Sequence, residues 1–253
     1  MSVNKVVASF DEAVKDVFDG AVILFGGFGA NVPSLLIQAL ARQGAKNLTM
    51  VSNNTGLGRE IMKRMGRTLP DWWDDVSILC ENKQIKKAIT SFPVRASPEL
   101  IVPFEKLFQA HEVEVENVPQ GTLAERIRAN KAGIGAFFTP TGAGTIIEQG
   151  KEVRVIDGRP YVLEYPIKSD FALVRAYKAD RLGNLIYRGT SRTFNATMAG
   201  AANVTIAEVD EVVPVGKLDP EEIVTPAVYV DRVVVRPQEA RTKIIQKIRR
   251  EEH

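Results

Sequence analysis

Short apolar runs that alternate with amphipathic stretches constrain the fold of this chain more than any other feature. The run at residues 21–25, AVILF, is followed directly by glycines, and a helix-like stretch opened by Pro33 and Ser34 separates it from a second apolar run at residues 48–51. A strand that is apolar throughout is typical of a parallel sheet with both faces covered. This part of the chain therefore predicts a strand, a loop, a helix and a second strand, in that order.

The same alternation returns later in the chain. The predicted elements there are an apolar run at residues 113–118, a helix that starts at Thr122, and apolar runs at residues 135–138 and 171–176. Strands that alternate with helices indicate an α/β protein, here an open, mostly parallel sheet flanked by helices. In such sheets, ligands bind outside the carboxyl ends of the strands.

Other regions follow different patterns. Residues 154–166 place an Asp157-Gly158 pair between two arms of alternating polarity, which predicts a β-hairpin added to the main sheet. Apolar residues at helical spacing predict a first helix that ends near Gly20. Prolines interrupt residues 66–103, which we interpret as a variable lobe. We expect residues 1–236 to form the domain and residues 237–253 to form a basic C-terminal tail.

Composition and charge narrow the class of partner. The 33 basic and 31 acidic residues leave a formal net charge of +2, so no overall field would recruit nucleic acid or an anionic membrane. No apolar run approaches the roughly 20 residues that a membrane helix needs, and the N-terminus lacks the pattern of a secretory signal. We expect a cytoplasmic protein with neither nucleic acid nor a membrane as its partner.

Residue types that ligate metals are few. Cys80 is the single cysteine, so no intramolecular disulfide can form, which fits a reducing compartment. His111 and His253 are far apart in sequence and lack ligand spacing. No metal site is expected.

A glycine-rich loop follows the first predicted strand. Gly26, Gly27, Phe28 and Gly29 stand between a strand and a helix, where the backbone can approach a ligand and present N–H groups to negative charge. A dinucleotide-binding fingerprint would need a third glycine at the start of the helix, and Val32 occupies that position. Nicotinamide binding is therefore excluded, while substrate binding by the loop stays a candidate.

Neutral amides supply the other candidate site residues. Asn53 and Asn54 follow the second strand, and Gln120 lies in a Val-Pro-Gln-Gly turn just ahead of a helix, where Thr122 and Glu125 have the spacing of a capping box. Amides can donate hydrogen bonds to a developing oxyanion without changing charge. The alternative for the two asparagines is an Asx turn that merely ends the strand.

Five segments carry a resemblance to a known family. They are DGAVILFGGFG (residues 19–29), VSNN (51–54), ENVPQGTLAERIRANKAGIGAFFTPTGAGT (116–145), SDFALVRAYKADRLGNLIYR (169–188) and IVTPAVYVDRVV (223–234). Together they resemble the A (alpha) subunit of the family I CoA-transferases, which include succinyl-CoA:3-oxoacid CoA-transferase. The resemblance covers nearly the whole chain and implies a fold like that of sugar-phosphate isomerases.

The resemblance also implies that this chain is half of an enzyme. In the family, a glutamate in a Glu-Asn-Gly context on the B (beta) subunit attacks the acyl thioester in a ping-pong reaction. Coenzyme A is a substrate there, and no cofactor is bound. Glu81 and Glu116 are each followed by asparagine but not then by glycine, so no catalytic residue is expected in this chain. The implied partner is a B subunit, in a heterotetramer of two A and two B chains that acts on acyl-CoA and carboxylate substrates.

Site roles follow from the same resemblance. Asn53, Asn54 and Gln120 would line the acyl pocket beside the glycine loop, and Arg192 and Asn195 would bond a loop to the edge of the sheet. The family loop is one residue longer and carries a further glycine before its proline. Because the lobe at residues 66–103 also departs from the family pattern, the acyl specificity stays open.

The residues leave two other functions open. One is a sugar-phosphate-isomerase-like enzyme, which would need its own acid or base near a phosphate loop. The other is a non-catalytic scaffold subunit on the same fold. Arg126, Arg128 and Lys131 could meet the phosphates of coenzyme A, but charges at helical spacing are more often a solvated face.

Overall fold

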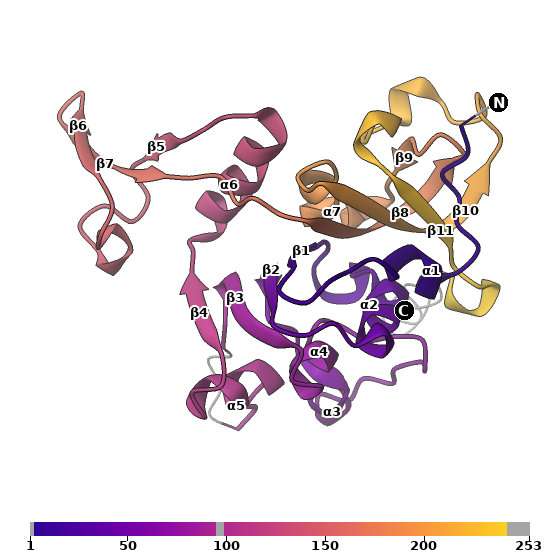
Figure 1. Cartoon of the computed structure of the whole chain (residues 1–253), viewed down its shortest axis with the longest axis horizontal. Coiled ribbons are helices and arrows are strands. Elements are labelled where there is room, and N and C mark those ends of the chain that lie inside the picture. The colour runs from indigo at the N-terminus through magenta and orange to yellow at the C-terminus, as the bar shows by residue number, and fades with distance from the viewer. Residues whose placement is uncertain (1–2, 95–98, 242–253) are drawn as a thin grey trace, which may run out of the picture.

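An open, mostly parallel sheet organises the residues that the computed structural model describes, which are 3–94 and 99–241. Seven strands follow the order β11-β10-β8-β1-β2-β3-β4, and β9 pairs with β8. Their bounds are β1 (Val22–Phe25), β2 (Leu48–Asn54), β3 (Ile85–Phe92), β4 (Glu114–Asn117), β8 (Phe171–Asp180), β9 (Leu185–Ile186), β10 (Val204–Val213) and β11 (Arg232–Val235). Neighbouring strands are parallel except β8 and β9, which confirms the predicted sheet (Figure 1).

Helices cover both faces of this sheet, and each face has its own apolar core. The first core includes residues of α1 (Phe10–Val14), α2 (Ser34–Gln43), α4 (Ser77–Glu81) and α5 (Pro103–Gln109), and the second includes residues of α6 (Gln120–Ala132) and α7 (Thr193–Met198). Side chains alternate between the cores along each strand. Phe25 and Met50 belong to the first core, and Leu24 and Val51 to the second. Burial on both faces explains why these strands are apolar throughout.

A separate three-stranded sheet stands off the main body as an arm (Figure 1). It has the antiparallel order β5 (Phe137–Thr139), β7 (Arg159–Glu164), β6 (Val153–Ile156). Asp157 and Gly158 form its turn with φ of 49° and 76°, as a tight hairpin requires. The predicted hairpin is confirmed. The expectation that it joins the main sheet is wrong, as is the assignment of residues 135–138 to that sheet, because β5 pairs with β7 instead.

A chain of ion pairs fixes the arm to the body. Glu116 of β4 pairs with Lys87 of β3 at 2.8 Å and with Arg126 of α6 at 2.6 Å. Arg126 also lies 3.7 Å from Glu164 of β7, which pairs with Lys151 at 2.6 Å. Glu164 is buried, so its charge needs these partners. Arg126 therefore belongs to a partly buried network and not to a solvated face.

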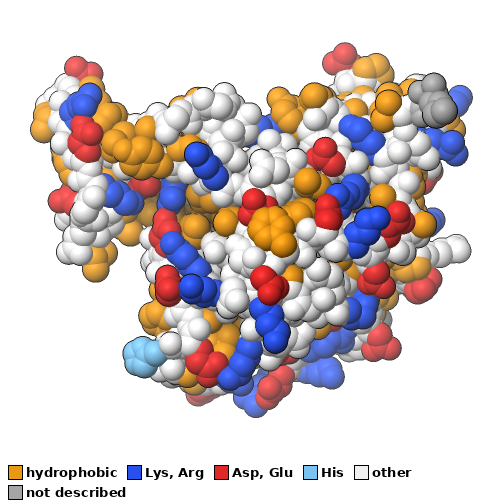
Figure 2. Space-filling view, viewed as in Figure 1, with side chains coloured by type: hydrophobic (Ala, Val, Ile, Leu, Met, Phe, Trp, Pro, Cys, Tyr) orange, Lys and Arg blue, Asp and Glu red, His pale blue; other side chains and the backbone are white. Residues whose placement is uncertain are grey.

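The surface of the arm is rich in apolar side chains. Figure 2 shows hydrophobic side chains over much of the arm, with acidic and basic groups between them. Ile146, Val155 and Tyr165 are exposed there. On the side of the main body that faces the viewer, charges of both signs are interspersed, in keeping with the small net charge.

Two predicted helix boundaries differ from the structure. α1 ends at Val14 and not near Gly20, because hydrogen-bonded turns replace the helix after that residue. α6 begins at Gln120, since the amide of Leu123 donates to the carbonyl of Pro119 at 2.8 Å. Thr122 therefore lies inside the helix, where its buried side chain caps nothing, and the predicted capping box is not formed.

The region predicted as a variable lobe is only partly irregular. Both α4 and β3 lie within residues 66–103, and β3 occupies an inner position in the sheet. The register between β2 and β3 shifts once, between Leu48 and Thr49, so that Lys86 is an extra residue on β3. Residues 242–253 of the predicted tail lie outside the described residues, and the division at residues 236 and 237 stays a prediction. Within the described ranges, no helix has the length and hydropathy needed to cross a membrane.

Candidate functional site

A pocket of about 410 Å³ lies at the carboxyl ends of β1 and β2, between α6 and α7. Its lining residues are Phe28, Asn53, Gln120, Gly121, Ala124, Thr193, Phe194 and Thr197. Three of these, Phe28, Asn53 and Gln120, are residues that the sequence predicted for the site. The structure thus brings together the glycine loop, the end of the second strand and the start of α6, where α/β sheets bind ligands.

Two side-chain amides form one wall of this pocket. Nε2 of Gln120 donates to Oδ1 of Asn53 at 2.5 Å, which joins α6 to β2. Asn53 is only 2% exposed, and its Nδ2 has no hydrogen-bond partner among the described residues. A buried donor left unpaired costs about 1–3 kcal/mol. Asn53 lines the pocket, so its wall contains a donor that has no partner among the described residues.

Asn54 lies on the other side of the strand. β2 continues through Asn54, so consecutive side chains point to opposite faces of the sheet. Oδ1 of Asn54 accepts a hydrogen bond from the amide of Gly56 at 3.0 Å, which is the geometry of an Asx turn. Asn54 is not among the residues that line the pocket. The structure brings Asn53 to Gln120 but does not bring Asn54 with it.

Close packing or a positive φ requires each glycine of the loop. A Cβ on Gly26 would lie 2.2 Å from Oδ1 of Asn195, and one on Gly27 would lie 2.2 Å from the carbonyl oxygen of Asn31. Gly27 and Gly29 also have positive φ, at 88° and 60°. Of the four predicted loop residues, only Phe28 lines the pocket, and its side chain is 53% exposed.

Asn195 holds this loop to the sheet. Its Nδ2 donates to the carbonyls of Asn31 at 3.0 Å and Ser191 at 2.9 Å, and its Oδ1 accepts from the amide of Arg175 on β8 at 2.9 Å. Asn195 is completely buried. The expectation that Asn195 bonds a loop to the sheet is confirmed, but the strand that it contacts, β8, is an inner one and not an edge.

The N-terminus of α2 already holds a carboxylate from within the protein. Oε2 of Glu208, on β10, accepts from the amides of Leu35 at 2.9 Å and Leu36 at 3.0 Å. Glu208 and its ion-pair partner Arg236 are both completely buried. The first turn of the helix therefore does not offer these two amides to a ligand anion. Any contact with an anion in this region would have to come from the loop itself.

Several pocket residues were missed by sequence reasoning. Thr193, Phe194 and Thr197 of α7 form the wall opposite the amides, and Gly121 and Ala124 of α6 lie beside Gln120. Helical spacing could have indicated Ala124, because it lies four residues after Gln120 and so shares its face of the helix. The α7 residues gave no such signal, since only tertiary packing places α7 opposite α6.

Ser91 is a further residue close to this wall. The register pairs Ser52 with Thr90 and Asn54 with Phe92, so Ser91 lies beside Asn53 on the same face of the sheet. Its hydroxyl is buried and has no hydrogen-bond partner in the part of the chain that the structure describes.

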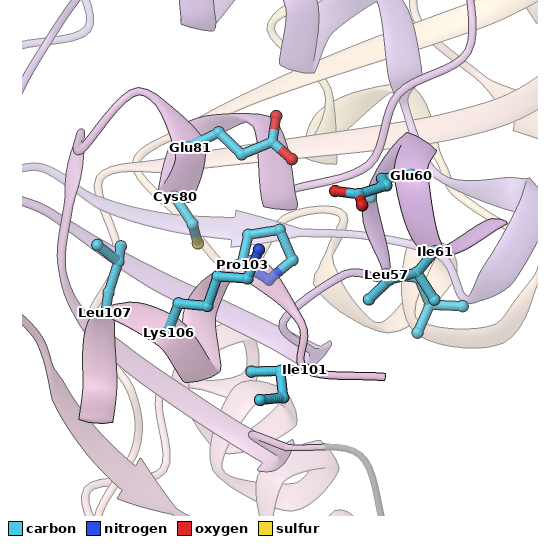
Figure 3. A pocket seen from close by; sticks show the side chains of 10 residues that line it. Leu57, Glu60, Ile61, Cys80, Glu81, Ile101, Pro103, Lys106 and Leu107 are labelled. Carbon is cyan, nitrogen blue, oxygen red and sulfur yellow. The ribbon is translucent and has the colours of Figure 1, made fainter. Parts of the chain in front are cut away.

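The two Glu-Asn pairs lie away from the pocket lining. Burial would raise the pKa of the Glu116 carboxyl, but hydrogen bonds from Lys87 and Arg126 outweigh it and hold that pKa below its ordinary value. Glu81 lines a second pocket, of about 160 Å³, among α3 (Gly58–Arg64), α4 and α5 (Figure 3). Figure 3 shows its carboxylate across from that of Glu60. That pocket adjoins the first core, on the face of the sheet opposite α6 and α7.

The chemistry of the main pocket is that of neutral hydrogen bonding. Among the residues that the structure describes, those lining the pocket include no carboxylate, amine, imidazole or thiol. The same part of the chain holds no cluster of three His, Cys, Asp or Glu side chains that could bind a metal ion. The pocket can orient a polar ligand and stabilise charge on an oxygen atom. The attacking group must come from elsewhere.

Comparison with known proteins identifies the family. A family model described as Coenzyme A transferase matches residues 7–236. The chain is 47% identical over 247 residues to the A subunit of 3-oxoadipate CoA-transferase of Pseudomonas putida, a match that covers 97% of this chain and 100% of that one. It is 48% identical over 233 residues to the A subunit of a probable succinyl-CoA:3-ketoacid coenzyme A transferase of Bacillus subtilis (strain 168), with 92% and 90% covered. The chain belongs to the coenzyme A transferase family.

A solved structure has the same fold. The acyl-CoA transferase YdiF of Escherichia coli O157:H7, in a thioester complex with CoA, matches with a TM-score of 0.77 at 24% identity. The match covers 93% of this chain and 48% of YdiF, so this chain spans about half the length of that protein. The likeness bears out the CoA-transferase fold, while the likeness to sugar-phosphate isomerases stays a prediction.

Proposed function

We propose that this chain is the A subunit of a two-subunit CoA-transferase, which moves coenzyme A between an acyl-CoA and a short-chain carboxylate or 3-oxoacid. Relatives named as A subunits align with it over nearly their whole length. The observation that carries the proposal is the wall formed by Asn53 and Gln120. It offers an unpaired buried donor, and the residues that line the pocket with it include no carboxylate.

The reaction that suits this wall is a ping-pong exchange. A glutamate of the B subunit attacks the thioester carbonyl, the carbon–sulfur bond breaks, and an acyl-glutamyl anhydride and the thiolate of coenzyme A are formed. The thiolate then attacks the glutamyl carbonyl and releases the first carboxylate, leaving coenzyme A on the enzyme as a thioester. A second carboxylate removes it by the reverse of these steps.

In this scheme the chain stabilises the charge that develops on the carbonyl oxygen. The nucleophile that forms the new bond to the carbonyl carbon comes from the B subunit. Nδ2 of Asn53 donates to the carbonyl oxygen as that oxygen becomes an oxyanion. Gln120 fixes the orientation of the Asn53 amide through their 2.5 Å hydrogen bond. A donor that is fixed before the reaction lowers the barrier without a cost of reorganisation. Asn53 and Gln120 thus act as an oxyanion-stabilising pair, with Phe28 and α7 closing the acyl pocket.

The other two functions gain no support from the pocket. A sugar phosphate would need positive charge near its phosphate group, and none of the described residues that line the pocket carries one. A scaffold would have no use for an unpaired donor buried at a pocket wall. We retain the transferase function alone.

For the assembly we propose a heterotetramer of two A and two B chains that acts in the cytoplasm. The relatives are named as A subunits, and a single buried cysteine fits a reducing compartment. Light scattering on the co-purified pair measures the stoichiometry. A mass other than that of two copies of each chain would contradict this assembly.

Co-expression with a B subunit tests the function. CoA transfer is expected from the pair and from neither chain alone. Incubation of this chain alone with acyl-CoA and borohydride should leave no modified glutamate, because borohydride reduces an enzyme thioester only where one has formed. Transfer by this chain on its own, or an inactive pair with every carboxylate tried, would contradict the proposal.

A further inference from the structure

The first turns of α6 present two small residues to the pocket. Gly121 and Ala124 both line it, directly after Gln120. Gly121 is exposed, and a Cβ built on it would have no atom of the described residues within 4 Å. The space that its side chain would fill is pocket volume.

Neither the backbone nor packing among the described residues explains the glycine at this position. Gly121 lies inside a regular helix and is not among the glycines with positive φ, and glycine is less favourable than alanine in a helix. Gly26 and Gly27 differ, because a Cβ on either would collide with the chain at 2.2 Å. The absent side chain at Gly121 therefore leaves room that none of the described residues fills.

The axis of α6 leads from the wall formed by Asn53 and Gln120 to the space beside Gly121. Ala124 is four residues beyond Gln120, which corresponds to about 6 Å along the helix axis. An acyl group whose carbonyl oxygen meets Nδ2 of Asn53 would extend past Gly121 first and Ala124 next. Phe194 of α7 also lines the pocket. On the α6 side, the pocket is therefore bounded by the α-hydrogens of Gly121 and the methyl group of Ala124.

We propose that Gly121 and Ala124 are the specificity-determining residues of this subunit, because their small side chains set the length of acyl group that the pocket accepts. The inference rests on the proposed function, since it takes the pocket to be the acyl pocket. Gly121 limits the width next to the carbonyl, and Ala124 limits the far part of the chain.

Variants that add methyl groups test this assignment. Gly121→Val and Ala124→Val are compared with wild type in the complex with the B subunit, using two-, four- and six-carbon acyl-CoA donors. We expect a loss of kcat/KM that grows with acyl length and reaches about tenfold or more for the six-carbon donor, since single methylene-sized changes in such pockets are worth roughly 10–200-fold. Ala132→Val is the matched control, because Ala132 is exposed at the other end of the same helix.

A loss that is equal at every acyl length would overturn the assignment, as would no loss at any length. Binding of free acetate, butyrate and hexanoate to the full chain, measured by calorimetry, gives a readout that needs no turnover. The ratio of hexanoate to acetate affinity should fall in Gly121→Val and stay at the wild-type value in Ala132→Val. An unchanged ratio refutes the role of Gly121 even if the pair proves inactive, whereas inactivity of the wild-type pair refutes the transferase function.

Folding is checked with a smaller change. Gly121→Ala should keep or raise the melting temperature, because alanine favours the helix and its methyl group meets no atom of the described residues. The same variant should already lower the ratio of six- to two-carbon transfer. A lower melting temperature would show that the glycine serves packing, and would contradict the proposal.

Discussion

The side-chain amide of Gln120 donates to Oδ1 of Asn53 at 2.5 Å, although the two residues are 67 positions apart in the sequence. This bond ties the N-terminus of α6 to the carboxyl end of β2. It uses the acceptor of Asn53 and leaves its donor, Nδ2, unpaired among the described residues in a buried position. The pair thus defines which side-chain atom of Asn53 lacks a partner among the described residues.

Replacing Gln120 tests how much the fixed orientation of the Asn53 amide contributes to catalysis. In the complex with the B subunit, Gln120→Ala should lower kcat by about a hundredfold, or about 3 kcal/mol, because the Asn53 donor is no longer fixed for the oxyanion. The free energy of unfolding should fall by about 1–3 kcal/mol, because Oδ1 of the buried Asn53 loses its hydrogen-bond partner Gln120. Steady-state kinetics and thermal unfolding measure both effects. Gln109→Ala on α5 is the control, because Gln109 is an exposed glutamine in the opposite helix layer. Unchanged turnover in Gln120→Ala would remove the residue from the mechanism.

The two neighbouring asparagines give a matched comparison. Asn53→Asp replaces the unpaired donor by a carboxylate oxygen that repels a developing oxyanion, so kcat should fall more than a hundredfold. Asn54→Asp keeps the acceptor that bonds the amide of Gly56, and its loss should be far smaller. Steady-state kinetics of both variants in the complex measures the difference. Equal losses in the two variants would place both side chains in the acyl pocket, as the family resemblance alone implied.

The buried pair of Arg236 and Glu208 should matter for stability. Arg236→Met leaves the Glu208 carboxylate without its cation in a fully buried position, and we expect a loss of about 3–5 kcal/mol in the free energy of unfolding. Arg42→Met removes an exposed pair with Asp11 and should cost under about 1 kcal/mol. Urea unfolding of both variants measures the difference. A similar cost for both would mean that the internal pair adds nothing specific.

The ionised state of Glu116 should make part of the stability depend on pH. Its folded-state pKa lies below the ordinary value of 4.5, because the hydrogen bonds from Lys87 and Arg126 outweigh the effect of burial. A lowered pKa stabilises the fold above the ordinary value, and that contribution is lost as the pH falls through the folded-state pKa. Glu116→Gln should therefore be less stable than wild type at neutral pH, with the gap closing below about pH 4. Urea unfolding of both proteins across this pH range measures the gap.

The activity of Glu116→Gln tests whether Glu116 takes part in the reaction. Because Glu116 lies outside the pocket lining and pairs with two cations, Glu116→Gln should retain turnover close to that of wild type in the complex at neutral pH. A loss as large as that expected for Asn53→Asp would assign it a part in the reaction.

Sequence patterns predicted the layers of the fold well, because apolar periodicity is a local property. The strand at residues 21–25 and the helix after Pro33 are read directly from which side chains must be buried. The pairing of β5 with β7 was not predictable in this way. A short run such as that around Phe137 has the same composition whether it joins the main sheet or a separate one.

The site was predicted in part for a related reason. Asn53, Gln120 and Phe28 lie at turns and strand ends, and those positions can be recognised from sequence. The opposite orientation of Asn54 depends on the strand continuing three residues further than its apolar run, through Asn54. The contribution of Thr193 depends on α7 packing opposite α6, which no local pattern encodes.

The extra residue Lys86 has an effect far from its own position. Side chains alternate between the two faces of a strand, so an insertion in one strand changes which of its residues accompany each residue of its neighbour. Without the shift between Leu48 and Thr49, the partner of Asn53 on β3 would be Thr90 in place of Ser91. One irregular step near the amino ends of β2 and β3 thereby decides which hydroxyl group stands next to the amide at their carboxyl ends.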